Sequence, residues 1–218
     1  DKILDAIDEA LKGHHTLTLE DTDILPQVDT KRLVTTGGHF AYLKIAEGCD
    51  KHCTYCIIPK IRGNFRSVPM EQLIEEASYL AEQGVKELIL VAQETTLYGK
   101  DLYGEKSLHK LLKELCKISG IRWIRILYDE LIQTIKEEPK ICHYLDLPIQ
   151  HANDEILKRM GRRTTKQERI DIIGKLRKEI PDIALRTTLI TGFPGETNEQ
   201  HEELMEFVDE MEFDRLGV

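Results

Sequence analysis

"FAYLKIAEGCDKHCTYC", residues 40–56, joins an apolar, strand-like run to three closely spaced cysteines. From this point to the end of the chain, strand-like runs alternate with helical patterns. The candidate strands are 40–46, 87–92, 122–128, 141–147, 183–191 and 213–218. The candidate helices between them are 69–84, 107–118, 129–137, 153–160, 165–179 and 197–211. Two of these helices open with capping-box pairs, Thr165 with Glu168 and Thr197 with Gln200.

Strict alternation of strand and helix predicts a parallel sheet with right-handed crossover connections. Six such units can form either a doubly wound open sheet or part of a barrel. No glycine-rich fingerprint follows the first strand, which weakens the dinucleotide-binding version of the open sheet. We therefore predict an α/β fold for residues 40–218: a partial (open) TIM-like (β/α)6 barrel of parallel strands with outer helices.

Residues 1–39 differ from the rest of the chain. A short amphipathic helix is followed by a stretch with no sustained period, which indicates the tail of an upstream domain and a linker. A second irregularity lies where "RWIRILY" meets "DELIQTIKEE", because a strand end meets a helix start with no turn between them. Such connections normally take about 2–6 residues. We expect a loop to be missing between Tyr128 and Asp129.

The composition is that of an ordinary globular protein, with 218 residues, 41% hydrophobic and 32% charged. No apolar run approaches the roughly 18 residues of a membrane span, and no signal segment opens the chain, so we predict a cytoplasmic protein without a membrane partner. The formal net charge of −9 disfavours a protein that binds nucleic acid through phosphate contacts. Five cysteines, three of them clustered, are a poor pattern for a secreted disulfide framework.

Cys49, Cys53 and Cys56 follow the first strand with C-x3-C-x2-C spacing. A structural zinc site normally needs four ligands, and Cys116 and Cys142 are isolated in a helix and a strand. A thioredoxin-like pair would leave Cys49 unexplained. An iron–sulfur cluster suits clustered thiolates, and three ligands on a four-iron cluster leave one iron open for a substrate or cofactor. The spacing therefore favours a [4Fe–4S] cluster over zinc or a redox pair.

Further polar groups follow other candidate strands, at the end where parallel (β/α) folds carry their functional sites. They are Gln93, Glu94, Thr95, Gln150, His151 and, after the "TGFPG" turn that contains Gly192 and Gly195, Glu196. We expect them to share one site with the cysteines.

Each of these groups also has a plain structural interpretation. Glu94 and Thr95 could form a turn, His151 could be a core or capping residue, and the glycines could serve backbone geometry alone. Arg186, within a strand, could bind a carboxylate or form an ordinary ion pair. A basic run could be a solvated face, or it could meet an anion near the mouth of the barrel, at the carboxyl ends of the strands. The run contains Lys158, Arg159, Arg162, Arg163 and Lys166.

The cysteine spacing, with Tyr55 just before the last cysteine, resembles that of the radical S-adenosylmethionine (SAM) superfamily. The resemblance implies that the open iron chelates the amino and carboxylate groups of SAM, and that reductive cleavage gives a 5′-deoxyadenosyl radical. It also implies a set of cofactor-binding residues around that position: Tyr55, Gln93, Glu94, Thr95, Gln150, His151, Arg186 and Gly192.

The stretch from Ala41 to Val218 resembles the methylthiotransferases, and most closely the ribosomal-protein aspartate methylthiotransferase (RimO) family. The segments that carry the likeness are "YLKIAEGCD", "CTYCIIPKIRGNFRS", "LILVAQETTLYG", "LPIQHANDEILKRMGR" and "LRTTLITGFPGET". The resemblance implies methylthiolation of the β-carbon of an aspartate in the twelfth small-subunit ribosomal protein, with an electron donor such as flavodoxin or ferredoxin. It also implies an amino-terminal domain with a second [4Fe–4S] cluster and a carboxy-terminal TRAM domain, both absent here. Such a fragment is expected to cleave SAM without completing methylthiolation.

Two alternatives stay open at this point. The related tRNA methylthiotransferases act on isopentenyladenosine, but they usually have asparagine after the first cysteine and a Gln-Asn-Val segment after the second strand. This sequence has Asp50 and Gln93-Glu94-Thr95 instead, although the ribosomal-protein family more often has aspartate in place of Glu94. Acidic net charge also suits a basic protein substrate better than tRNA. The alternative from another class is a metal-stabilised binding module without catalysis.

Overall fold

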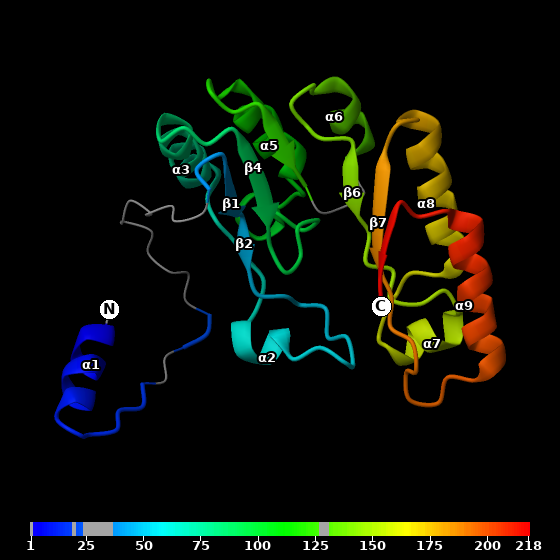
Figure 1. Ribbon diagram of the computed structural model, residues 1–218, viewed down its shortest axis with the longest axis horizontal. Coiled ribbons are helices and arrows are strands. Elements are labelled where there is room, and N and C mark those ends of the chain that lie inside the picture. The colour runs from blue at the N-terminus through cyan, green and yellow to red at the C-terminus, as the bar shows by residue number, and fades with distance from the viewer. Residues whose placement is uncertain (1, 19–20, 24–36, 127–130) are drawn as a thin grey trace.

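The computed structural model describes residues 2–18, 21–23, 37–126 and 131–218. Six parallel strands follow one another in chain order, as the alternation predicts. β1 (Phe40–Lys44), β4 (Glu87–Val91) and β5 (Trp123–Arg125) form one sheet, and β6 (Tyr144–Asp146), β7 (Ala184–Thr188) and β8 (Arg215–Gly217) form the other. A parallel bridge between Ile124 and Ile141 connects the two sheets. The strands therefore make a curved, open arrangement, and the predicted partial barrel is confirmed (Figure 1).

The six predicted helices are also present. They are α3 (Met70–Glu82), α5 (Leu108–Lys117), α6 (Ile132–Glu137), α7 (Asp154–Arg159), α8 (Lys166–Glu179) and α9 (Asn198–Met211). Both capping boxes are formed. In each, the threonine side chain accepts from the backbone N–H of the third helical residue, and the side chain of that third residue accepts from the threonine backbone N–H. The sequence did not indicate the short helices α2 (Ile58–Arg62) and α4 (Lys100–Tyr103), whereas α1 (Ile3–Leu11) is the predicted amphipathic helix.

The strands bury one face against the helices and leave the other face open. In β1, Ala41 and Leu43 are buried while Tyr42 is half exposed, and the same alternation recurs in β4 and β7. The buried face packs on leucine-rich stripes of the helices, such as Leu73 and Leu80 of α3. Burying one leucine fully stabilises the fold by about 1.5–3 kcal/mol. The helices thus cover one side of the sheet, and the concave side carries the remaining side chains.

The carboxyl ends of the strands point toward the lower part of Figure 1, where α2 and α7 lie. One local feature there was missed. The segment predicted as a single strand over 40–46 ends at Lys44, and the chain then forms a small antiparallel pair, β2 (Ala46–Glu47) with β3 (Arg66–Ser67). Because each of these strands has two residues, no sequence period could reveal them. This pair carries the cysteine loop.

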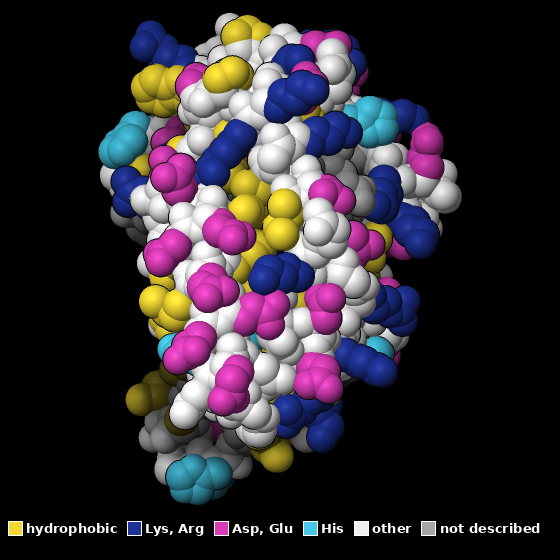
Figure 2. Space-filling model, turned by 90° about the vertical axis from the view of Figure 1, so that its right-hand side faces the viewer, with side chains coloured by type: hydrophobic (Ala, Val, Ile, Leu, Met, Phe, Trp, Pro, Cys, Tyr) yellow, Lys and Arg dark blue, Asp and Glu magenta, His cyan; other side chains and the backbone are white. Residues whose placement is uncertain are grey.

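Three further predictions concern a missing loop, membrane-spanning segments and the charge of the surface. The predicted missing loop between Tyr128 and Asp129 lies outside the described residues. Within the part of the chain that the structure describes, no helix is both long and apolar enough to cross a membrane. Figure 2 shows the side on which α8 and α9 lie, and acidic side chains are frequent there, in agreement with the exposed Glu202, Glu206 and Asp209 of α9.

Candidate functional site

The cysteine loop begins with a glycine that no other residue could replace without strain. Gly48 has a φ of +74°, which disfavours residues with a Cβ atom. An added Cβ would lie 2.6 Å from the carbonyl oxygen of Gly63 and still closer to that of Asn64. The next residue, Cys49, donates its backbone N–H to the Gly63 oxygen at 3.3 Å. The first cysteine is therefore held against the strand pair that follows the loop.

Two further residues of the loop, Lys51 and Thr54, fix it across the mouth of the barrel. Lys51 forms an ion pair with Glu94, which follows β4. Thr54 donates its backbone N–H to the Met160 oxygen and its hydroxyl to the Arg159 oxygen, each at 3.0 Å, where α7 ends. The structure thus brings Glu94 and part of the basic run to the cysteines, although these segments are far apart in the sequence.

All five cysteines are free thiols. Cys49 is buried, and burial raises the pKa of its thiol, although the Lys51 backbone N–H donates to Sγ at 3.4 Å and opposes the shift. Cys53 and Cys56 are half-buried. Burial and the neighbouring Cys53 raise the pKa of Tyr55 to about 12, so its phenol is protonated at neutral pH.

Three free thiols on one loop fit the donor chemistry of an iron–sulfur cluster with one open iron. Cys116 lies in α5 and Cys142 follows the Ile141 bridge, so neither shares an element with the loop. In the conformation described, no group of three His, Cys, Asp or Glu side chains within the described ranges is arranged to hold a metal ion. Each cysteine of such a cluster binds a different iron, so the absence of a single-ion site from the described part of the chain leaves the three thiols available for a cluster.

The 93–96 segment is partly buried behind the loop. Glu94 and Thr95 are buried, and the Thr96 hydroxyl and backbone N–H both donate to Oε1 of Glu94. Oε1 of Gln93 is buried and accepts no hydrogen bond from any described residue. A buried acceptor of this kind normally has a partner, so it is suited to a ligand N–H group.

His151 and Glu196 connect the ends of β6 and β7. His151 is fully buried, its Nδ1 accepts from the Asn153 backbone N–H at 3.0 Å, and its Nε2 lies 3.4 Å from Oε1 of Glu196. Burial lowers the pKa of His151, so its ring is neutral with the proton on Nε2. Burial alone would raise the pKa of Glu196, but the Phe193 backbone N–H, which donates to it at 2.9 Å, and the nearby His151 and His201 rings lower it overall. In this conformation His151 serves the packing of the mouth, which favours the core interpretation.

The glycine turn and the basic run hold each other in place. Gly192 and Gly195 have φ values of +69° and +79°, and a Cβ on Gly195 would lie 3.0 Å from Cζ of Arg159. Arg159 donates to the backbone oxygens of Pro194 and, at 3.0 Å, Gly195. Arg162 donates to the Pro148 oxygen at 2.9 Å. Two arginines of the run therefore fix mouth loops rather than forming a fully solvated face.

Gln150 and Arg186 occupy the β6–β7 side. Gln150 has a φ of +69°. Its backbone N–H donates to the backbone oxygen of Thr188 at 3.0 Å, and its backbone oxygen accepts from the backbone N–H of Ile190 at 2.7 Å. Arg186 lies within β7, and its Nη1 donates to Oδ2 of Asp146 at 2.5 Å. Arg186 thus forms an ion pair with a residue of the neighbouring strand. It lies within β7, whereas the other candidates lie beyond the strand ends, at the mouth of the barrel.

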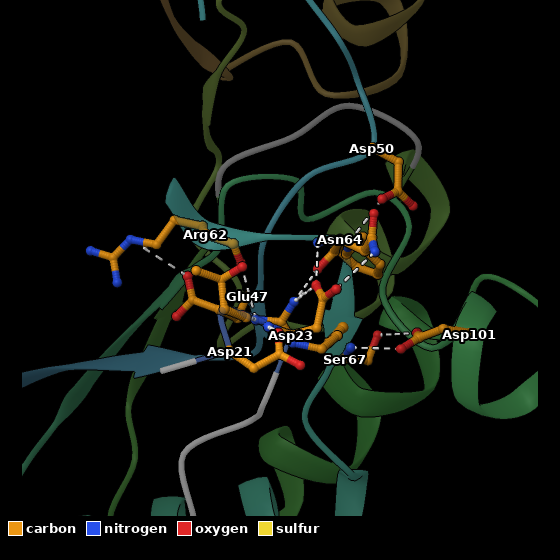
Figure 3. A network of polar contacts seen from close by, with 11 residues as sticks. Asp21, Asp23, Glu47, Asp50, Arg62, Asn64, Ser67 and Asp101 are labelled. Atoms are coloured by element: carbon orange, nitrogen blue, oxygen red, sulfur yellow. Dashed lines mark hydrogen bonds and ion pairs between the residues drawn. The ribbon is translucent and has the colours of Figure 1, made fainter. Parts of the chain in front are cut away.

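Figure 3 shows a polar network that sequence reasoning missed. Asp23, within the predicted linker, accepts from the backbone N–H of Asn64 at 2.8 Å, from its side-chain amide at 3.2 Å and from Nη1 of Arg66 at 3.1 Å. Asp50 accepts from the Phe65 N–H at 2.9 Å. A residue of the predicted linker and a residue of the cysteine loop itself therefore converge on segment 63–66. No local pattern could reveal the Asp23 contacts, because they join positions about forty residues apart.

The model of the Radical SAM superfamily matches residues 43–208, which include the cysteine loop and the strand ends just described. The chain belongs to the radical SAM superfamily.

Solved structures of proteins with SAM or a SAM analogue bound share the fold. The radical SAM methyltransferase TsrM from Kitasatospora setae, solved with tryptophan and a SAM analogue, matches 82% of this chain and 35% of its own, with a TM-score of 0.65 at 18% identity. SuiB from Streptococcus suis, solved with SAM, matches 82% of this chain and 40% of its own, with a TM-score of 0.57 at 16% identity. At such identities the likeness supports the radical SAM fold alone, and it agrees with the open barrel.

Curated relatives are much more similar in sequence. The ribosomal protein uS12 methylthiotransferase RimO of Lachnoclostridium phytofermentans is 65% identical over 225 residues, covering 100% of this chain and 51% of the relative. The protein of that name from Clostridioides difficile is 50% identical over 225 residues, covering 100% of this chain and 50% of the relative. The radical SAM chain described here spans about half the length of the curated relatives it matches.

Proposed function

We propose that this chain is the cofactor-binding core of a RimO-type methylthiotransferase. The carrying observation is the 65% identity to a protein named for that activity, over the whole of this chain. The proposed reaction replaces a hydrogen on the β-carbon of an aspartate in ribosomal protein uS12 with a methylthio group. Residues 40–218 are the proposed radical SAM core and residues 1–39 the tail and linker of an upstream domain. We also propose a cytoplasmic location and an electron donor of the flavodoxin or ferredoxin type.

In this proposal Cys49, Cys53 and Cys56 hold a [4Fe–4S] cluster. When bound, the cluster and SAM together supply a carbon radical able to abstract hydrogen from an unactivated carbon. The protein's part is to hold these groups, orient them and exclude water. Lys51 and Thr54 support this role, because their contacts with Glu94 and the end of α7 fix the cysteine loop across the mouth.

The strand ends are the proposed SAM-binding side of the mouth. Gln93 offers a buried acceptor for a ligand N–H, and Glu94 and Thr95 lie beside it. Gln150 and Gly192 contribute backbone at positive φ, where the chain turns at the ends of β6 and β7. Tyr55 flanks the last cysteine with a protonated phenol. His151 is the buried member of this side of the mouth, next to Glu196 and the glycine turn.

A tRNA substrate is the second candidate, and the charge of the chain favours the ribosomal protein over it. The net charge of −9 and the acidic outer side of α9 suit a basic protein better than a polyanion (Figure 2). Asp50 does not decide between them, since its acceptor bond from Phe65 needs only a side-chain oxygen that asparagine also has.

The test uses the full-length protein that contains this chain, reconstituted anaerobically with iron and sulfide and supplied with SAM and a reductant. Purified uS12 and tRNA compete in the same reaction, and mass spectrometry identifies the modified product. We expect methylthiolated uS12 and none with the Cys53→Ala variant. Methylthiolated tRNA with unmodified uS12 would contradict the proposal. The 218-residue chain alone is expected to yield 5′-deoxyadenosine without a methylthiolated product.

A further inference from the structure

Three charged residues form a row across the β6–β7–β8 sheet. Asp146 pairs in register with Arg186, and Arg186 pairs with Arg215. Side chains of residues paired in register on parallel strands point to the same face. Leu145 and Leu185, their neighbours along the strands, are fully buried in the core beneath the helices. The three charged side chains therefore lie on the concave face of the open barrel.

The row is incompletely paired. Arg186 uses Nη1 to donate to Oδ2 of Asp146, while its side chain is 43% exposed. Oδ1 of Asp146 is buried and accepts no hydrogen bond from any described residue. Arg215 is exposed and has no side-chain partner within the described part of the chain. One carboxylate thus faces two guanidinium groups, which leaves one positive charge in excess.

Arg125, also on the concave face, differs from this row because its charge is fully paired. Arg125 of β5 lies 2.6 Å from Oε1 of Glu87 on β4, and its guanidinium stacks over the Tyr144 ring at 5.4 Å from the centroid. That pair is balanced in charge and its arginine is covered by an aromatic ring. On the β6–β7–β8 part of this face, electrostatic attraction for an anion therefore comes from Arg186 and Arg215.

We propose that Arg186 and Arg215 bind the carboxylate of the substrate aspartate, and that Asp146 holds Arg186 in position. A guanidinium that donates one N–H to Asp146 keeps further N–H groups for a two-point contact with a second carboxylate. This inference rests on the proposed function and adds the residues that distinguish aspartate from its neutral analogue.

The location suits the proposed reaction. Arg186 precedes Thr188, the last residue of β7, by two positions, which is about 7 Å along a strand. Gly192 follows that strand end, and Gln150, which follows β6, forms a bridge with Leu189 just beyond it. In an aspartate the β-carbon is bonded directly to the carboxyl carbon. A carboxylate bound at Arg186 would therefore place that carbon between the arginine row and the cofactor side of the mouth.

The experiment measures peptide binding by the full-length, cluster-loaded protein with SAM bound and no reductant, so that no turnover occurs. The probes are a uS12 peptide that contains the target aspartate and the same peptide with asparagine, followed by fluorescence anisotropy. We expect the wild-type protein to prefer the aspartate peptide. Arg186→Gln should weaken binding of that peptide at least tenfold and abolish the preference, and Arg186→Lys should restore part of it. SAM affinity should stay within twofold of wild type.

Two further variants keep the test decisive. Arg215→Gln removes an exposed, unpaired arginine, so it should fold normally and still reduce the aspartate preference at least threefold. Arg122→Gln is the matched control, because it removes an equal charge from an exposed position at the other end of the strands. It should bind both peptides like the wild type.

The outcomes separate this inference from the proposed function. If the wild-type protein prefers the aspartate peptide and both Arg186→Gln and Arg215→Gln retain that preference, the inference is wrong while the proposed function stands. Loss of SAM affinity in Arg186→Gln with an unchanged preference would assign Arg186 to the cofactor and also overturn it. A wild-type protein that binds neither peptide would overturn both.

Discussion

Replacing Gly48 by alanine should destabilise the chain far more than a glycine replacement at the same φ elsewhere. Gly48 has a φ of +74°, and adopting the left-handed region costs an ordinary residue about 1–2 kcal/mol. The added Cβ would also overlap the backbone oxygens of Gly63 and Asn64. Because these neighbours are backbone atoms, the chain must shift, and overpacking of this kind costs about 1–3 kcal/mol more. We expect a total loss of about 2–5 kcal/mol.

Gly104 supplies the matched control. It ends α4 with a φ of +75°, and a Cβ there would meet nothing within 4 Å. Gly104→Ala should therefore lose only the backbone cost of about 1–2 kcal/mol. The difference between the two variants isolates the contact between Gly48 and the strand pair that carries the cysteine loop.

The assay is urea and thermal unfolding of the 218-residue chain, followed by circular dichroism for both variants under one set of conditions. In a domain of this size each kcal/mol shifts Tm by about 2–4 °C, so an additional 2 kcal/mol should lower Tm by about 4–8 °C. Equal losses in Gly48→Ala and Gly104→Ala would refute the reasoning, because they would mean that the loop does not pack as described.

The other predictions concern the linker, a helix cap and a buried histidine. Asp23→Ala should speed hydrogen exchange at the Asn64 backbone N–H, which loses its acceptor, while Asp21→Ala, which removes only a local bond, should leave it unchanged. Thr165→Ala should cost about 1 kcal/mol in urea unfolding because it removes the capping box of α8; an unchanged unfolding free energy would speak against that cap. His151 has a lowered pKa because it is buried, so the unfolded chain binds its proton more readily, and stability should be complete above pH 6.5 and decline as pH falls below it. His151→Gln should flatten stability just below about pH 6.5, the ordinary histidine pKa; an unaltered slope would show that another group titrates there.

Much of the architecture could be predicted from the sequence, because the alternation of strand and helix has a strong period. The six parallel strands, their outer helices and both capping boxes depend on local patterns that a reader can count along the chain. The β2–β3 pair was missed for the opposite reason. Each strand has two residues, and the pairing of Ala46 with Ser67 is a non-local contact that no period encodes.

The candidate site was predicted in part. The cysteine spacing and the polar residues at strand ends indicated where the site lies, because parallel strands present their carboxyl ends at one edge. The role of Arg159 in holding the glycine turn could not be foreseen, since a charge run in sequence says nothing about which carbonyl each arginine reaches. The Asp23 contacts likewise depend on residues 21–23 lying against segment 63–66, which no local pattern encodes.

The central claim is that Cys49, Cys53 and Cys56 hold a [4Fe–4S] cluster with one iron open to SAM. The most direct measurement is the electron paramagnetic resonance spectrum of the anaerobically reconstituted, reduced chain, recorded before and after SAM is added. We predict the signal of a reduced [4Fe–4S] cluster that changes when SAM binds. A sample that assembles no such cluster, or a cluster signal that SAM leaves unchanged, would contradict the claim.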